Sequence, residues 1–157
     1  IAKKVARSFA DIAVACMMIG FARGILVVLQ NGHIIDTVVY ALSIPLSKLP
    51  GWISGEAMLI VQTLLNFLIP SGSGQAVTSM PIMAPLADLC GISRQVAVLA
   101  FQFGDGLSNI IWPTAMTPIM CGIAGVKMDK WWKFIVPLFL ILLVTQGVLI
   151  AIATRIW

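Results

Sequence analysis

Two short polar runs interrupt an otherwise apolar chain, and their side chains are of the kinds that bind small ions and polar solutes. The first run is Pro70-Ser71-Gly72-Ser73-Gly74-Gln75, and the second, which contains Asp105, extends from Gly104 to Asn109. Hydroxyl, amide and carboxylate oxygens coordinate cations such as Na⁺, and free backbone N–H groups at the start of a helix bind anions. The two runs therefore predict a site for a cation and a polar solute.

The composition around these runs is that of a membrane protein. Of the 157 residues, 60% are apolar and 10% are charged, and the mean hydropathy is +1.03. Soluble domains have about 45–50% apolar and about 25% charged residues. This composition excludes a disordered chain, a collagen-like fibre and a solvent-exposed nucleic-acid binder, because too few charges remain for a water-facing surface. We therefore expect the lipid bilayer, and no nucleic acid, as a partner.

The length of each apolar stretch predicts how the chain meets the bilayer. A spanning helix needs about 20 apolar residues to cross a core about 30 Å thick. Residues 1–32 fit a first transmembrane helix with a basic flank, 33–52 an interfacial arm helix, and 127–157 a last transmembrane helix. In the last helix, the uncharged stretch from Phe134 to Ala153 lies between tryptophans of the kind that anchor at membrane interfaces, Trp131, Trp132 and Trp157.

Residues 53–91 predict a re-entrant helical hairpin. No residue between Glu56 and Asp88 is charged, and one helix of that length would be about 45 Å long, more than the hydrocarbon thickness. The break is expected at Pro70 to Gln75, which leaves one half-helix from Glu56 to Ile69 and another from Ala76 to Leu89. A surface loop between two short spans is the alternative.

Residues 92–126 predict a discontinuous transmembrane helix, with its break at Gly104 to Asn109. Non-helical backbone at membrane depth is tolerated where it lines a cavity or is buried in protein, so both breaks indicate a site. Asp105 is a functional candidate because carboxylates inside the membrane are costly. The alternative is a structural partner of Arg23 or Arg94, and we expect Glu56, Asp88 and Arg94 to lie in water at the mouth of the hairpin.

The candidate site residues come from the two breaks and their flanks. For substrate binding, the candidates are Asn66, Ser71, Gly72, Ser73, Gly74, Asn109 and Thr114. For cation binding or coupling, they are Ser73, Thr78, Gly104, Asp105, Ser108 and Asn109. We expect no cofactor and no metal site apart from one for sodium, with a sodium ion or a proton as the coupling ion.

Motifs of the common enzyme classes are absent from the sequence. Ser71 and Ser73 fit no G-x-S-x-G elbow, and with one histidine there is no H-E-x-x-H motif. We therefore expect a protein that is not an enzyme. A passive channel or a structural membrane subunit without coupled transport is the alternative, although a channel favours uninterrupted pore helices.

Long motifs in the chain resemble those of the anaerobic C4-dicarboxylate carrier-like family, and within it the branch of basic amino acid antiporters. The motifs run from Gln62 to Ala76, from Met80 to Asp88 and from Arg94 to Gly106, with Asn109, Pro113-Thr114 and the two earlier segments Gly20 to Ile25 and Asn31 to Asp36. The dicarboxylate branch of the wider superfamily carries a Ser-Asn-Thr hairpin tip, from which Ser71-Gly72-Ser73-Gly74 departs.

This resemblance implies membership of the ion transporter superfamily. Carriers of that superfamily have two inverted repeats, each with a re-entrant hairpin and a discontinuous helix, and they assemble as dimers with an elevator-like moving domain. One such set of elements implies the C-terminal half of a carrier, with the N-terminal half and a second copy as partners. By the same resemblance, the hairpin tip and the segment from Gly104 to Asn109 form the cation site and half of the substrate site.

Taken together, the patterns predict an all-α polytopic membrane protein, multi-pass in the bacterial inner membrane. Its basic residues favour a cytoplasmic location for the chain segments before the first and last spans. The predicted function is secondary active transport, as a cation-coupled symporter or exchanger of a small carboxylate-bearing metabolite such as an amino acid or a C4-dicarboxylate. Three roles stay open for Asp105: holding a substrate ammonium, joining the ligands of the cation, or carrying the coupled proton.

Overall fold

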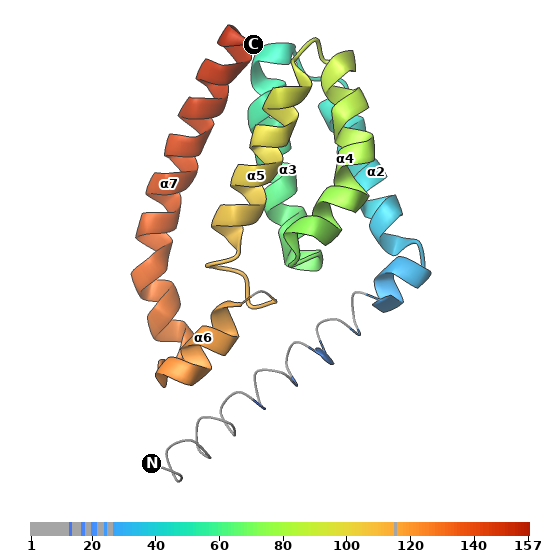
Figure 1. Ribbon diagram of the computed structural model, residues 1–157. Coiled ribbons are helices and arrows are strands. Elements are labelled where there is room, and N and C mark those ends of the chain that lie inside the picture. Colours follow the sequence, from blue (N-terminus) through green and yellow to red (C-terminus); the bar gives the residue numbers. More distant parts are fainter. Residues whose placement is uncertain (1–12, 14–16, 18–19, 22–23, 25–26, 115) are drawn as a thin grey trace.

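The computed structural model describes residues 13, 17, 20–21, 24, 27–114 and 116–157. All regular elements within these residues are helices, which confirms the all-helical prediction (Figure 1). Six of them have defined bounds: α2 (Ile34–Leu46), α3 (Gly51–Leu68), α4 (Gly72–Leu89), α5 (Arg94–Ser108), α6 (Thr117–Ala124) and α7 (Met128–Ile156). Most of the predicted first span, including Arg23, lies outside the described residues.

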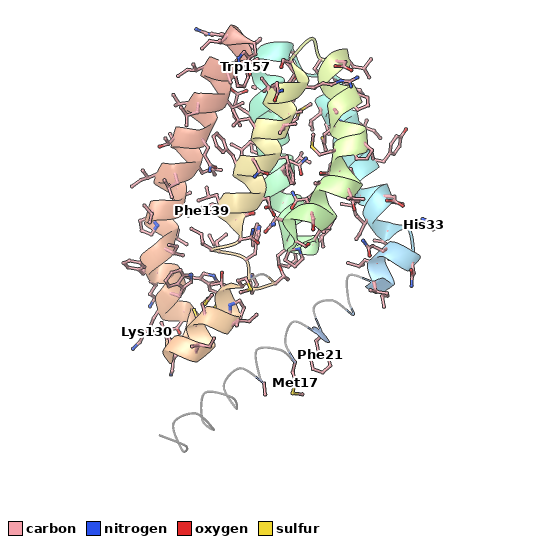
Figure 2. The ribbon with its side chains drawn as sticks, in the orientation of Figure 1. Met17, Phe21, His33, Lys130, Phe139 and Trp157 are labelled. Carbon is pink, nitrogen blue, oxygen red and sulfur yellow. The ribbon has the colours of Figure 1, made fainter. Side chains whose placement is uncertain are left out.

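Helix α7 is the long apolar element of the fold. Its 29 residues make it the one helix in the described part of the chain that is long and apolar enough to cross a membrane, by length and composition. It contains the predicted span from Phe134 to Ala153, and only 17% of its most apolar 18-residue stretch is buried. Lys130 and Trp157 mark its two ends in Figure 2. Its exposed apolar side chains include Phe134, Ile141, Val144 and Val148.

Helices α3 and α4 form a helical hairpin whose arms are 18 residues each. The break lies at Pro70 and Ser71, within the predicted run, but its predicted extension to Gln75 was wrong, because α4 already begins at Gly72 and the turn is limited to residues 69–71. Ser71 is the N-cap of α4, and its Oγ accepts a hydrogen bond from the Gly74 N–H at 3.4 Å. Figure 1 shows this turn at a level between the two ends of α7.

The predicted position of the second break was also wrong. Helix α5 continues to Ser108, and the irregular segment follows it over the described residues 109–114 and 116, before α6 begins at Thr117. A Cβ on Gly104 would lie 2.7 Å from the Gln62 Cβ and 2.9 Å from the Thr63 nitrogen. This glycine therefore allows α3 and α5 to approach closely within an intact helix.

The core lies where the other helices surround α3. Helix α3 packs on α5, α7, α4 and α2, and α5 also packs on α4 and α7. The fully buried apolar side chains at these contacts include Ile35, Met58, Leu65, Met83, Val96 and Ile150. Helix α2 lies beside α4 in Figure 1 and also contacts α3. That it lies along the membrane surface stays a prediction.

Candidate functional site at the hairpin tip

The side chain of Asp105, on α5, lies against the tip of the helical hairpin. Asn66, in the last turns of α3, donates a hydrogen bond from Nδ2 to Asp105 Oδ1 at 2.7 Å. The other carboxylate oxygen lies beside Gly72, the first residue of α4, where a Cβ would be 2.9 Å from Asp105 Oδ2. One carboxylate therefore touches both arms of the hairpin, next to the positive end of the α4 dipole.

A buried chain of polar side chains continues from Asn66 along the inside of the hairpin. Gln75 Oε1 accepts from Asn66 Nδ2 at 3.3 Å, and Gln75 Nε2 donates to both the Gln62 carbonyl and Gln62 Oε1 at 2.8 Å. Ser79 Oγ donates to Gln62 Oε1 at 3.1 Å. All four residues have 0% exposed area. Because buried polar groups are costly unless they are hydrogen-bonded, these contacts fix the two arms in one register.

Several polar groups at the tip have no partner among the described residues. They include two buried side-chain atoms, Asn66 Oδ1 and Gln62 Nε2. No described residue accepts a hydrogen bond from the N–H groups of Gly72 or Ser73 at the start of α4. The tip thus offers acceptors to a cation and free N–H donors to an anion.

The irregular segment after α5 has its carbonyl groups paired by side chains from later elements. Thr117 Oγ1 donates to the Asn109 carbonyl at 2.8 Å. The indole N–H groups of Trp131 and Trp132, in the first turns of α7, donate to the carbonyls of Ile110 and Ile111, each at 2.9 Å. Trp131 and Trp132 therefore stabilise the break, and their role as interfacial anchors stays a prediction.

The same segment is attached to the end of α3. Trp112 Nε1 donates to the Thr63 carbonyl and Thr114 Oγ1 donates to the Phe67 carbonyl, both at 2.8 Å. The rings of Phe67 and Trp112 pack edge to face with their centroids 5.3 Å apart. The Phe67 carbonyl is one of the last four of α3, which lack intrahelical partners, so Thr114 provides a donor where the helix end needs one. Trp112 adds a bond to a carbonyl inside the helix.

The structure brings some of the predicted site residues together and leaves others apart. Asn66, Gly72, Asp105 and Asn109 form one cluster, in which Asn109 Nδ2 donates to the Asp105 carbonyl at 2.8 Å. The hydroxyls of Thr78 and Ser108 bond to carbonyls of their own helices, Gly74 and Gly104. Ser73 is exposed, and its side chain bonds to none of the described residues. The binding roles of all these residues stay predictions.

Sequence reasoning missed the buried partners Gln62 and Ser79 and the donor Trp112. The signal for the first two was present as spacing. Gln62 and Asn66 are four residues apart on α3, and Gln75 and Ser79 are four apart on α4, so each pair lies on one helix face. Polar pairs at this spacing in apolar hairpin arms indicate facing partners.

The mouth of the hairpin, at the opposite end from the tip, bears on two expectations. Arg94 pairs with Asp88, with Nη2 2.6 Å from Oδ2, so the interpretation of Arg94 as the partner of Asp105 was wrong. Both side chains are exposed, as expected, whereas Glu56 is only half-buried at the mouth, with its Oε2 buried and without a partner among the described residues. The alternative partner Arg23 lies outside the described residues.

An apolar, all-helical chain with polar groups gathered at a hairpin tip and a helix break is typical of a secondary membrane transporter. Over residues 3–155, the sequence matches the family described as the C4-dicarboxylate anaerobic carrier, and the chain belongs to this family.

Two curated relatives are similar to most of the chain. A protein of Escherichia coli (strain K12) named "Putative basic amino acid antiporter YfcC" is 39% identical over 140 residues, or 85% of this chain. A Haemophilus influenzae protein, named only "Uncharacterized protein", is 36% identical over 141 residues, or 90% of this chain. The chain spans 28% of the length of each relative. No solved structure matches.

Proposed function

We propose that this chain forms part of a secondary active transporter that exchanges or symports a small carboxylate-bearing metabolite. One observation carries the proposal: Asp105 lies against both arms of the hairpin tip, hydrogen-bonded to Asn66 at 2.7 Å and beside the first residue of α4. A carboxylate next to a helix N-terminus with free N–H groups forms a bipolar site. Such a site suits a solute that carries both charges.

Among carboxylate-bearing solutes, an amino acid fits this pair of charges better than a C4-dicarboxylate. The substrate carboxylate would accept from the N–H groups of Gly72 and Ser73, and its ammonium would then lie near Asp105. The second carboxylate of a dicarboxylate would lie close to the Asp105 carboxylate. These two negative charges would repel each other unless a cation lay between them. The name of the Escherichia coli relative is in line with an amino acid substrate.

The coupling ion would use the oxygen acceptors of the same cluster. Asn66 Oδ1 is buried without a partner, and Asp105 Oδ2 lies at the tip. Carboxylate and amide oxygens are the ligands that Na⁺ takes, and a carboxylate can equally carry a proton. We propose that Asp105 takes part in coupling whichever ion is used.

The architecture that goes with this function is part of the proposal. We propose that α3 and α4 form a re-entrant hairpin, that the chain is the C-terminal half of a carrier, and that it pairs with an inverted N-terminal half. The whole carrier would be a multi-pass homodimer in the bacterial inner membrane. The position of the hairpin turn between the ends of α7 supports the re-entrant arrangement (Figure 1).

The test is uptake into proteoliposomes that contain the whole carrier. Labelled arginine and labelled succinate are compared, each with and without a sodium gradient and with and without amino acid inside. We expect saturable arginine uptake that internal amino acid stimulates. Sodium-driven succinate uptake would move Asp105 to the cation site of a dicarboxylate carrier, and non-saturable flux of both solutes would instead indicate a channel.

A further inference from the structure

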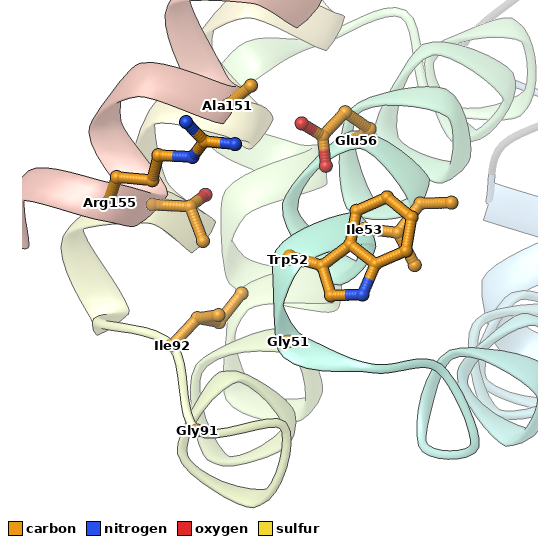
Figure 3. A pocket seen from close by; sticks show the side chains of 9 residues that line it. Gly51, Trp52, Ile53, Glu56, Gly91, Ile92, Ala151 and Arg155 are labelled. Carbon is orange, nitrogen blue, oxygen red and sulfur yellow. The ribbon is translucent and has the colours of Figure 1, made fainter.

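A groove opens at the mouth of the hairpin, away from the site at the tip (Figure 3). It has a volume of about 510 Å³ and lies between the start of α3, the turn that joins α4 to α5, and the last turns of α7. Its walls carry apolar side chains, among them Ile53, Ile92 and Ala151. None of the groups at the tip lines this groove, so it needs an explanation of its own.

Two opposite charges lie on either side of the groove. Figure 3 shows the Glu56 carboxylate on α3 and the Arg155 guanidinium on α7 directed into the same space. No ion pair joins them, although Asp88 and Arg94 pair closely nearby. Glu56 Oε2 is buried and has no hydrogen-bond partner among the described residues. Because an unpartnered buried carboxylate oxygen is costly, the groove calls for a donor that the described residues do not supply.

The groove lies at the level expected for lipid headgroups. It is next to the C-terminal end of α7, the helix long and apolar enough to cross the membrane. Trp157 ends that helix and is 66% exposed, and Trp52, on the groove itself, is 72% exposed. Exposed tryptophans and an arginine at the end of a spanning helix are typical of the membrane–water interface. A ligand with its own acyl chains could therefore reach the groove from the bilayer.

We infer that this groove binds the headgroup of an aminophospholipid, a zwitterion with a primary ammonium and a phosphate. The ammonium would donate to the Glu56 carboxylate, which lines the groove, and the phosphate would accept from Arg155, while the glycerol region would lie on the apolar wall. Arginine recognises phosphate through parallel hydrogen bonds, and a primary ammonium has three donors for a carboxylate. A phosphatidylcholine ammonium has no N–H group, and phosphatidylglycerol has hydroxyl donors but no cation, so neither would give Glu56 a hydrogen bond from a charged donor.

The experiment measures retained lipid by native mass spectrometry of the whole, delipidated carrier in detergent. The probes are phosphatidylethanolamine, phosphatidylcholine and phosphatidylglycerol with identical acyl chains, together with free phosphoethanolamine. Glu56→Gln and Arg155→Met are compared with Asp129→Asn and Lys133→Met, which remove the same charges from exposed positions at the other end of α7. Arg155→Lys keeps the charge and is the conservative variant. Because this experiment measures lipid binding and not uptake, a negative result would count against the lipid site and leave the proposed transport function unaffected.

We expect phosphatidylethanolamine to be retained about tenfold more tightly than the other two lipids, the difference that one or two charge-assisted hydrogen bonds make. Glu56→Gln should remove that preference, and Arg155→Met should lower the retention of all three lipids, because each of them carries the phosphate. The two control variants and Arg155→Lys should leave both the preference and the retention unchanged. Equal retention of the three lipids, or a preference that survives Glu56→Gln, would overturn the inference. Binding of free phosphoethanolamine without preference among the lipids would also overturn it, since the source would then be a soluble zwitterion.

Discussion

Asn66 and Asp105 are 39 residues apart in the sequence and are joined by a hydrogen bond of 2.7 Å. The bond connects the end of the first hairpin arm to α5, and the second arm begins beside the same carboxylate. Asp105 is therefore the point where three helices meet. Measuring both the transport and the stability of a variant at this position distinguishes a functional role of Asp105 from a structural one.

Asp105→Asn is expected to reduce coupled uptake to the background of empty liposomes. An amide in this position still accepts from Asn66 but carries no charge for an ammonium, a sodium ion or a proton. The structural cost should be small, about 1 kcal/mol for a weakened hydrogen bond. Uptake and thermal unfolding in detergent measure the two effects separately, with Asp129→Asn as the control. Uptake like that of the unsubstituted carrier would remove Asp105 from the proposed site.

Gly72→Ala should impair transport without unfolding the hairpin. The added Cβ would lie 2.9 Å from Asp105 Oδ2, which is the end of a flexible side chain, so the carboxylate should move away from the tip. We expect the apparent substrate affinity to fall about tenfold, which corresponds to about 1.4 kcal/mol. Gly122→Ala, where nothing lies within 4 Å of the added Cβ, is the matched control. If both variants transport equally well, the contact between Gly72 and Asp105 has no part in binding.

Two glycines of α5 should respond in opposite ways to alanine. Gly104→Ala places a Cβ against the backbone of α3, and overpacking of this kind costs about 1–3 kcal/mol. Gly106→Ala meets nothing within 4 Å and should stabilise the helix by up to about 1 kcal/mol. Thermal unfolding of the two variants in the same detergent measures the difference. A Gly104→Ala variant as stable as Gly106→Ala would contradict the close approach of α3 and α5 at Gly104.

Trp131→Phe should destabilise the segment between α5 and α6. The substitution keeps most of the apolar ring and removes the donor to the Ile110 carbonyl. A carbonyl left unpaired costs about 1–3 kcal/mol if it stays buried. Trp157→Phe, at the exposed end of α7, should stay within about 0.5 kcal/mol. Proteolysis of the folded carrier near Ile110 gives a local readout, and equal cleavage of both variants would count against the role of Trp131.

The helical hairpin could be predicted from the sequence because its cause is local. A long uncharged stretch with Pro70 in the middle exceeds what one helix can bury in a bilayer. The position of the second break was wrong for the opposite reason. A glycine in a helix can either end it or admit a neighbour, and at Gly104 the choice depends on Gln62 and Thr63, which are far away in the sequence.

The candidate site could be predicted only in part, because some of its features are local in the sequence and others depend on contacts between distant segments. Asp105 stood out because it is a carboxylate in an apolar segment. Its partner Asn66 was among the candidates, but the continuation through Gln75 to Gln62 depends on how two helices face each other. The surroundings of Glu56 could not be predicted, because the groove that it lines is shared with the end of α7, which is far away in the sequence.

The two indole hydrogen bonds from α7 to the break set a mechanical limit on the molecule. Trp131 and Trp132 hold adjacent carbonyls, and Trp112 from the same segment holds α3. Sliding α7 along its axis by one turn, about 5.4 Å, would break both of its bonds at once. A conformational change that preserves these hydrogen bonds must therefore move α3, α5 and α7 together. Any large displacement would then occur between this group of helices and another part of the carrier.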